Sequence, residues 1–242
     1  MTNEAQTFND IVNARRSIRI YDEKAPFDPE AVTRSLDRAL LAPNSSNLQL
    51  WEFYRVKTKA KKDELAQYCL GQKAAVTANE LIVFVTRRDK WKEHANFVLA
   101  EAMKDFPDKI GKREQLVIDY YKKIIPALYF SDPADVTGGV KKLAAAVTGA
   151  FRPVPRQVTA TDVRIVVHKS AALAAQTFML SMAAEGYDTC PMEGFDSARV
   201  KKFLQLPVAA EICMIVSVGK AKPEGVYGKR VRLPKEQVVF EI

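Results

Sequence analysis

The sequence predicts a single α+β domain, and three observations support this class. Residues 81–85 (Leu-Ile-Val-Phe-Val) and 212–218 are continuous apolar runs rich in β-branched side chains, which is typical of buried strands. Segments with apolar residues at helical spacing lie between such runs. The 242 residues, 48% of them hydrophobic, show no shift in composition that would mark a linker. We therefore expect one domain over residues 1–242.

The first part of the chain predicts two helices. Apolar side chains within residues 8–12 recur at helical spacing, so a short helix should end at a basic turn that begins near Arg15. Asp28 followed by Pro29 predicts the start of a second helix, because Asp accepts a hydrogen bond at the N-cap and Pro is well tolerated at the first helical position. This helix should end before Pro43.

The next elements follow from the same criteria. We expect a strand at 51–56, a helix at about 59–68 and the buried strand at 81–85. Residues 89–150 have helical character, and we interpret about 104–155 as a helical excursion from the domain.

The last third should contain one long helix and two strands. Residues 163–184 are apolar on almost every side, which indicates a helix at a subunit interface or, alternatively, at the centre of a monomer. Gly186 should end this helix in a left-handed conformation. Strands should follow at 212–218 and 238–242.

Composition limits the classes of function. The net charge of +8 is compatible with an anionic cofactor, an anionic substrate or nucleic acid. Zinc-finger spacing, an RNP-like aromatic strand and long Lys/Arg runs are all missing from the sequence, which argues against nucleic acid. Cys69, Cys190 and Cys213 have unrelated spacings and suit reduced thiols. With no signal peptide and no apolar run of about 18 residues, we expect a cytoplasmic protein without membrane contact.

Two basic segments near opposite ends of the chain predict a phosphate site. Arg15-Arg16-Ser17-Ile18-Arg19 and Arg230-Val231-Arg232 carry guanidinium groups at close spacing. Such groups bind phosphate oxygens bidentately, and the hydroxyl of Ser17 is a further donor. A solvated basic surface is the alternative interpretation of either segment alone.

Two further motifs lie between these segments. Residues 42–53 (Ala-Pro-Asn-Ser-Ser-Asn-Leu-Gln-Leu-Trp-Glu-Phe) form a loop rich in amides and hydroxyls, and residues 191–196 read Pro-Met-Glu-Gly-Phe-Asp. In this order the four motifs resemble the FMN-dependent nitroreductase family, whose pattern is an R-R-S-x-R-like turn, a P-S-S-x-N-x-Q-P-W-x-F-like loop, a P-x-E-G-F stretch and a K/R-x-R-L-P-like clamp. The resemblance spans residues 15–234.

This resemblance implies a fold and an activity. The fold would be a mixed or antiparallel sheet surrounded by helices, in an intertwined homodimer with a C-terminal tail strand. The activity would be FMN-dependent transfer of hydride from NADH or NADPH to nitroaromatic or quinone-type acceptors in two steps. Flavin-dependent reductive dehalogenation and flavin fragmentation, both found among relatives, remain alternatives. A flavin- or nucleic-acid-binding protein without turnover is an alternative from another class.

The resemblance also implies site residues. Arg15 and Arg230 or Arg232 would bind the FMN phosphate, Arg19 or Lys73 would stabilise charge on the reduced ring, and the loop at 44–49 would come from the other subunit. The candidate cofactor ligands are Arg15, Arg16, Ser17, Arg19, Asn44, Ser45, Asn47, Gln49, Lys73, Met192, Glu193, Gly194, Arg230 and Arg232.

The flavin carries the chemistry in this scheme, so neither a catalytic side chain nor a metal is expected, and His94 and His168 need not take part. Tyr121, Phe130 and Phe151 are candidate substrate contacts, although a helix packing face would explain them equally well. The chain departs from the family pattern at Asn44 and Leu50, where the family often has Ser and Pro.

Overall fold

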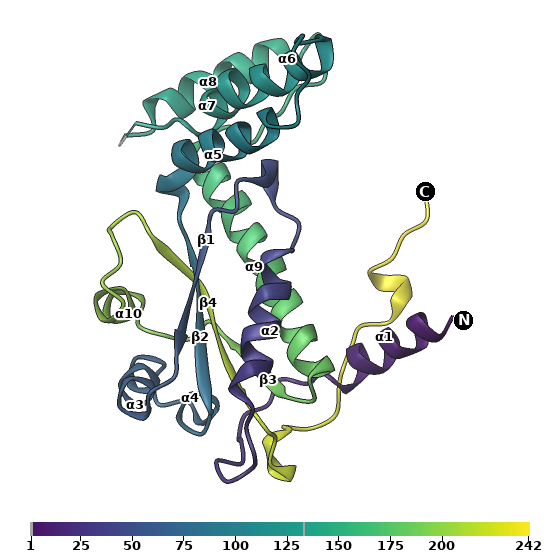
Figure 1. Ribbon diagram of the computed structural model, residues 1–242, viewed down its shortest axis with the longest axis vertical. Helices are drawn as coiled ribbons and strands as arrows, with labels where there is room; N and C mark the ends of the chain where they lie inside the picture. The colour runs from purple at the N-terminus through teal and green to yellow at the C-terminus, as the bar shows by residue number, and fades with distance from the viewer. Residues whose placement is uncertain (1, 133) are drawn as a thin grey trace.

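The computed structural model describes residues 2–132 and 134–242, and its centre is a four-stranded antiparallel sheet (Figure 1). The strands lie in the order β1-β2-β4-β3. Their bounds are β1 Trp51–Val56, β2 Glu80–Thr86, β3 Asp188–Met192 and β4 Glu211–Gly219. All three neighbouring pairs are antiparallel, and an isolated parallel bridge joins Ser17 to Thr189. The α+β class predicted from the sequence is confirmed.

Strand β2 shows why the sheet strands read as continuous apolar runs. Leu81, Val83 and Val85 contribute to a hydrophobic cluster on one face of the sheet. Ile82 and Phe84 contribute to a second cluster on the other face. Successive side chains point to opposite faces of the sheet. Because both faces are covered by hydrophobic clusters, residues 81–85 are all apolar.

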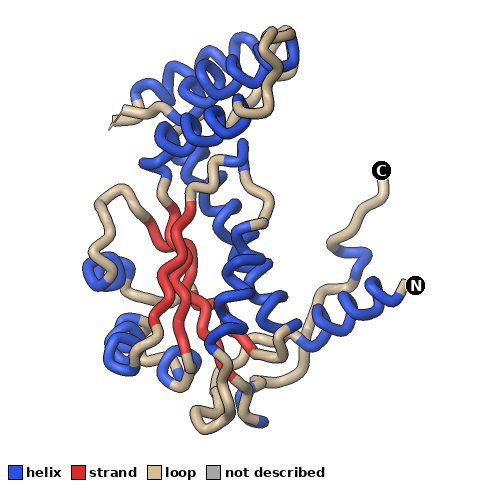
Figure 2. Tube along the Cα trace, in the orientation of Figure 1, coloured by secondary structure: helices blue, strands red, loops and turns tan. Residues whose placement is uncertain are grey.

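Helices cover both faces of the sheet (Figure 2). Helices α2 (Pro29–Leu40) and α9 (Ala160–Ala184) pack on one face, where Val32 and Phe178 are fully buried. The other face is covered by α3 (Lys59–Tyr68), α4 (Lys73–Val76) and α10 (Ser197–Phe203).

The helix boundaries follow the capping signals. The side chain of Asp28 accepts a hydrogen bond from the main-chain N–H of Glu30 at 2.9 Å, and Pro29 begins α2 as expected. Gly186 has φ of +76° beyond the end of α9, and Tyr187 N–H donates to Met182 O at 2.8 Å. This is the left-handed cap that the sequence predicts.

The helical excursion stands at one end of the molecule (Figure 1). The predicted excursion contains α6 (Lys112–Asp119), the π-helical turn η3 (Tyr120–Ile124), α7 (Ile125–Tyr129) and α8 (Val136–Thr148). The short turn η2 (Arg88–Lys90) and α5 (Trp91–Met103) lead into it. Buried Ile125 and Tyr129 pack with Leu48, Val163 and Val167. This third cluster fixes the excursion to the start of α9.

The two chain ends lie side by side, away from the sheet (Figure 1). Helix α1 (Asn3–Ala14) has no buried residue. The C-terminal segment contains the short turns η4 (Pro223–Gly225) and η5 (Lys235–Gln237). The strand predicted at 238–242 is not formed in this single chain. A strand needs a neighbour for its main-chain hydrogen bonds, and no other described segment of this chain pairs with these residues.

Two elements differ from simple sequence expectations. The sequence analysis does not predict β3, because Pro191 lies within it and Pro cannot donate to a β-ladder. The strand forms nevertheless, since it is at the edge of the sheet, where β4 is its only neighbouring strand among the described residues and its other side makes one isolated bridge, from Thr189 to Ser17. Within the described residues, none of the helices is both long enough and apolar enough to cross a membrane.

Candidate functional site

The two basic segments meet around one cavity. Its volume is about 250 Å³, and the residues that line it are Arg15, Arg16, Ser17, Arg19, Tyr227, Lys229, Arg230, Val231 and Arg232. Four of these follow α1 and five belong to the C-terminal segment, which here is called the arm (residues 226–234). The residue just before the arm is held to the N-terminal segment by a main-chain hydrogen bond from Arg19 N–H to Gly225 O at 2.7 Å. The structure therefore brings together the Arg residues that the sequence analysis grouped by chemistry.

The guanidinium groups hold the arm in place through main-chain oxygens. Arg230 donates from Nη2 to Asn13 O at 3.0 Å and to Arg15 O at 2.5 Å. Arg16 donates from Nη2 to Gly228 O at 2.8 Å. These bonds fix the geometry of the cavity but bring no negative charge to it.

The cavity is strongly electropositive. Among the described residues, no carboxylate forms an ion pair with any of its six cationic side chains. Burial, followed by the charges of Arg230, Arg232 and Arg16, lowers the pKa of Arg15. Bringing like charges together costs free energy, and an anion in the cavity would offset that cost.

Strand β3 runs from this cavity towards the predicted Glu193-Gly194 motif. In the middle of the strand, Arg19 donates from Nη1 to the Sγ of Cys190 at 3.0 Å. An extended chain advances about 3.3 Å per residue, so Gly194 lies up to about 13 Å farther along. There Gln72 donates from Nε2 to Gly194 O at 2.6 Å. Gln72, which this bond places at Gly194, is the residue before Lys73 in the chain.

Met192 is the exception in this motif. Its side chain is 2% exposed and belongs to the core cluster behind the sheet. The sequence analysis grouped it with possible cofactor ligands, but only its main chain is available to a ligand. The reason is the period of the strand, which turns alternate side chains into the core.

The amide- and hydroxyl-rich loop has an unusual backbone. It includes the short turn η1 (Ser45–Asn47), and Ser46, Asn47 and Gln49 have φ of +57°, +53° and +50°. The side chain of Asn44 supports this conformation, because its Oδ1 accepts the main-chain N–H of Gln49 at 2.9 Å. Side-chain oxygens that accept local main-chain donors are a common means of stabilising such turns.

This loop lies far from the cation cavity within one chain. Ser45 N–H donates to the Oγ of Ser170 at 3.3 Å, in the first half of α9. The fourteen residues from Ser170 to the end of α9 span about 21 Å. The two segments that line the cavity lie beside that end of the helix (Figure 1). The structure does not bring Asn44, Ser45, Asn47 and Gln49 to the Arg cluster of the same chain.

The three aromatic residues proposed for substrate contact do not form one wall. Tyr121 donates its hydroxyl to Ser46 O at 3.0 Å and so lies at the loop. Phe130 lines an apolar cavity of about 610 Å³ between α7 and α8, which neither Tyr121 nor Phe151 lines. Phe151 is 87% exposed. Of the three, Tyr121 contacts the loop that carries predicted cofactor ligands, through Ser46, which lies between Ser45 and Asn47.

A groove beside Glu193 was not foreseen from the sequence. Its volume is about 360 Å³, and it is lined by Arg164, Ile165, His168, Lys169, Ala172, Glu193, Cys213 and Met214. Glu211 accepts from Arg164 Nε at 2.5 Å and lies 3.2 Å from His168 Nε2. Burial opposes ionisation of Glu211, but these hydrogen bonds outweigh it and lower the carboxyl pKa. No motif marks the groove, because it joins helix and strand residues distant in sequence.

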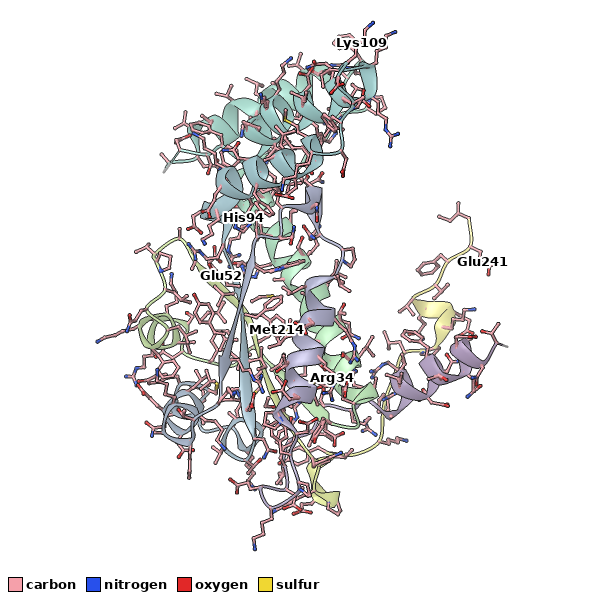
Figure 3. All side chains as sticks on the ribbon, in the orientation of Figure 1. Arg34, Glu52, His94, Lys109, Met214 and Glu241 are labelled. Atoms are coloured by element: carbon pink, nitrogen blue, oxygen red, sulfur yellow. The ribbon has the colours of Figure 1, made fainter. Side chains whose placement is uncertain are left out.

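Two further features have structural explanations. His94 lies where the excursion joins the sheet (Figure 3), and its Nδ1 is 2.7 Å from Leu48 O, which ties helix α5 to the loop.

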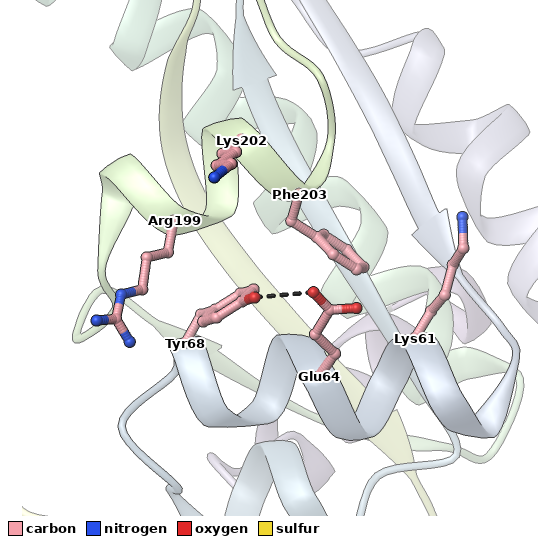
Figure 4. A pocket seen from close by; sticks show the side chains of 6 residues that line it. All are labelled: Lys61, Glu64, Tyr68, Arg199, Lys202 and Phe203. Atoms are coloured by element: carbon pink, nitrogen blue, oxygen red, sulfur yellow. Dashed lines mark hydrogen bonds between the residues drawn. The ribbon is translucent and has the colours of Figure 1, made fainter.

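A cavity of about 600 Å³ between α3 and α10 is shown in Figure 4, where Tyr68 donates to Glu64 Oε1 at 2.8 Å. None of the predicted site residues lines that cavity.

Comparison with known proteins identifies the family. The sequence model of the nitroreductase family matches residues 12–220. The chain belongs to the nitroreductase family. The matched span contains the first basic segment, the loop and the Glu193-Gly194 motif, but it ends before the arm. Assignments on the arm therefore depend on the geometry of the cavity.

Relatives of this nitroreductase family member are similar over nearly the whole chain. YdgI of Bacillus subtilis, which is named as an NAD(P)H nitroreductase, is 27% identical over 219 residues, covering 90% of each chain. The 4-nitrobenzoate reductase of Pseudomonas putida is 22% identical and covers 95% of this chain and 91% of its own.

Solved structures share the fold. The nitroreductase ydfN of Bacillus subtilis superposes with a TM-score of 0.75 at 23% identity, covering 98% of this chain and all of its own. A nitroreductase of Exiguobacterium sibiricum, solved in complex with FMN, has a TM-score of 0.65 at 25% identity and covers 97% of each chain.

Proposed function

We propose that this member of the nitroreductase family is an FMN-dependent oxidoreductase that takes hydride from NADH or NADPH and reduces nitroaromatic or quinone-type acceptors in two successive half-reactions. The observation that carries the proposal is the cation cavity, where Arg side chains from both ends of the chain surround one space. The FMN-bound relative and the relatives named as NAD(P)H nitroreductases support the same cofactor and donor.

The donor set of the cavity fits the phosphate end of FMN. A phosphate monoester has three strong acceptor oxygens, and Arg15, Arg230 and Arg232 offer guanidinium donors around a space of about 250 Å³. The hydroxyl of Ser17 adds a neutral donor on the same wall. A phosphate at this position would also relieve the mutual repulsion that lowers the pKa of Arg15.

The far end of β3 fits the ring of FMN. The main chain of Glu193 and Gly194 follows the strand directly, and Gly194 lacks a Cβ that would keep a planar ligand away. Lys73 is exposed beside it and offers a cation to negative charge on the ring. Because Arg19 contacts Cys190 in the middle of β3, between the cavity and Gly194, we assign it to the ribityl and ring side of the phosphate cavity.

A complete site requires a second chain. The loop residues Asn44, Ser45, Asn47 and Gln49 supply neutral donors and acceptors, but the loop contacts α9 at Ser170, about 21 Å from the end of the helix beside which the cavity segments lie. We therefore propose a homodimer in which the loop of one chain, with Tyr121 behind it, completes the site of the other. Three unpaired cysteines further support a reducing compartment such as the cytoplasm.

In this mechanism the side chains and main chain of the protein bind FMN and orient its ring. Bound FMN supplies the transfer of hydride from reduced nicotinamide to the acceptor. The cavity cations hold its phosphate, and the Glu193-Gly194 main chain and Lys73 position and polarise the ring. Protons come from solvent at an open site, so no acid or base side chain is required.

The absorption spectrum of the purified protein tests this proposal. We expect a yellow protein with flavin absorbance that is bleached by NADH or NADPH without oxygen and restored by a nitroaromatic or a quinone. A colourless protein that takes up no added FMN would refute the cofactor. A flavoprotein that is bleached but not reoxidised by either acceptor would refute the substrate class.

A further inference from the structure

The cation cavity carries more positive charge than one phosphate can balance. Six cationic side chains line it: Arg15, Arg16, Arg19, Lys229, Arg230 and Arg232. No carboxylate is among the lining residues. A phosphate monoester contributes about −1.5 to −2 charges near neutral pH. With FMN bound as proposed above, about four positive charges remain.

The protein does not neutralise this excess by itself. Arg16, Arg230 and Arg232 donate to main-chain oxygens, which carry no net charge. Arg19 donates to the Sγ of Cys190, a thiol whose pKa is raised by burial and which is therefore neutral. The Lys229 side chain is exposed at the rim of the cavity. The positive field therefore extends from the cavity into solvent.

The cavity also has room for more than one phosphoryl group. A water molecule occupies about 30 Å³ in the liquid, so a volume of about 250 Å³ corresponds to roughly eight waters. One phosphoryl group, with three terminal oxygens, fills only part of that space. The proposed phosphate clamp of Arg15, Arg230 and Arg232 leaves three cations, of which Arg19 is assigned above to the ribityl and ring side, so Arg16 and Lys229 remain.

We propose that this cavity binds a second phosphate, the 2′-phosphate of NADPH, and that the protein consequently prefers NADPH to NADH. The inference rests on the proposed function, because it takes reduced nicotinamide dinucleotide as the electron donor. NADH lacks only this phosphate, so the two donors differ in the group that excess positive charge attracts. Arg16 and Lys229 at the rim are the residues that we assign to it.

Binding of two nucleotides to the FMN-loaded protein tests the assignment. Adenosine 2′,5′-bisphosphate and adenosine 5′-monophosphate differ only in the 2′-phosphate, and both can be titrated calorimetrically. We expect the bisphosphate to bind at least about tenfold more tightly, as one charge-assisted hydrogen bond provides. The advantage should shrink between about 50 and 200 mM salt, because exposed charges are screened. Equal affinity for the two nucleotides would overturn the proposal.

Variants at the rim locate the second phosphate. Lys229→Gln should reduce the affinity for the bisphosphate about tenfold and should lower the ratio of kcat/KM for NADPH to that for NADH by a similar factor. Lys235→Gln, which changes an exposed lysine outside the cavity, is the matched control. If Lys229→Gln and Arg16→Gln both leave the preference for the bisphosphate unchanged, the second phosphate is not held here.

The flavin spectrum separates this inference from the proposed function. If the bisphosphate binds only while FMN is released, the cavity holds a single phosphate and the inference is wrong, although FMN dependence stands. If the protein neither holds FMN nor is reduced by either dinucleotide, the proposed function fails first. If FMN is held and both dinucleotides reduce it equally well, only the inference fails.

Discussion

The arginine side chains around the cation cavity have two roles: they hold main-chain oxygens and they offer donors to an anion. Arg230 and Arg16 use part of their donors to hold main-chain oxygens of the opposite segment. A guanidinium group has five N–H donors in a fixed plane, so it can bind a carbonyl on one side and an anion on the other. Lysine cannot reproduce this geometry, which is why the structural positions are occupied by arginine.

Arg232 tests the clamp at the scale of one residue. Its Nη1 donates only to the adjacent Val231 O, so removing the side chain leaves the arm anchored by Arg230 and Arg16. Arg232→Ala should weaken FMN binding by about 1.5–3 kcal/mol, the value of a charge-assisted hydrogen bond. Equilibrium titration of the apoprotein with FMN measures this loss. An unchanged FMN affinity, equal to that of Lys235→Ala, would remove Arg232 from the clamp.

Site residues could be predicted where their side-chain chemistry suggests a ligand. They could not be predicted where only their position in the fold brings them to the site. The arginines could be grouped because guanidinium groups in two short segments suggest one anionic ligand. Lys229 and Tyr227 line the same cavity but belong to no recognisable pattern. Met192 was assigned by its place in a motif, whereas strand alternation turns its side chain into the core. A linear motif does not state which side of a strand a residue occupies.

At the scale of elements, helices α2 and α9 are joined by polar groups at one edge of their contact. Ser181 donates to the Oγ of Ser35 at 2.9 Å. Glu185 accepts from Arg34 at 2.7 Å and from Arg38 at 2.6 Å. The hydrogen bonds from these two arginines lower the pKa of Glu185 to about 2.

This pKa predicts a dependence of stability on pH. The pKa of Glu185 in the unfolded chain is near its usual value of 4.5, above the folded value of about 2. Its contribution is therefore complete above about pH 4.5 and is lost as the pH falls towards 2. Glu185→Gln should lower Tm by about 2–4 °C at pH 7, since the pairs are near the surface. A difference in Tm that persists undiminished at pH 2.5 would contradict this account.

A substitution at Gly225 tests the contact between the start of the C-terminal arm and the N-terminal segment. Gly225 is buried, and a Cβ added there would lie 2.3 Å from Ile20 O and 3.1 Å from Ile18 Cγ2. Gly225→Ala should therefore cost about 1–3 kcal/mol of unfolding free energy and weaken FMN binding by displacing the arm. Chemical denaturation and FMN titration measure the two effects.

Gly139 provides the matched control for this substitution. It lies within α8, and a Cβ added there would meet nothing within 4 Å. Gly139→Ala should be neutral or stabilising by about 0.4–1 kcal/mol, because it reduces the freedom of the unfolded chain. If Gly225→Ala behaves in the same way, the arm is not packed against the N-terminal segment as described.

Most elements could be predicted, and the exceptions have physical causes. Strands β2 and β4 could be predicted from their apolar runs, α2 from its capping residues, and α9 from its apolar composition and the glycine that follows it. Strand β3 contains Pro191, which argues against a strand unless its place at the sheet edge is known. The apolar run at 238–242 resembles a strand but has no pairing edge within its own chain.

At the scale of the whole molecule, several apolar surfaces lack a partner in a single chain. Helix α1 buries none of its residues, and Phe8 is 55% exposed. Ile165 and Leu173 are both 47% exposed along α9, the helix whose apolar character suggested an interface. Together with the separation of the loop from the cavity, these surfaces fit the proposed homodimer.

A charge on the exposed side of α9 tests this assembly. Leu173→Glu should convert the dimer into a monomer and weaken FMN binding, because a buried unpaired carboxylate is costly and the partner's loop would be lost. Sedimentation velocity and FMN titration report the two changes. Val208→Glu, at a loop position that is 93% exposed, should affect neither. A wild-type protein that sediments as a monomer and still binds FMN tightly would contradict the two-chain site.

The most direct test of the central claim compares FMN with riboflavin, which lacks the phosphate. Titration of the apoprotein with each flavin measures what the converging arginines contribute. We predict that FMN binds at least about a hundredfold more tightly than riboflavin, as two charge-assisted contacts would provide. This ratio should fall strongly when Arg15 and Arg232 are both replaced by Ala, with Arg230 and Ser17 left to hold the phosphate. Equal affinities for the two flavins in the wild-type protein would show that the cavity does not hold the phosphate of FMN.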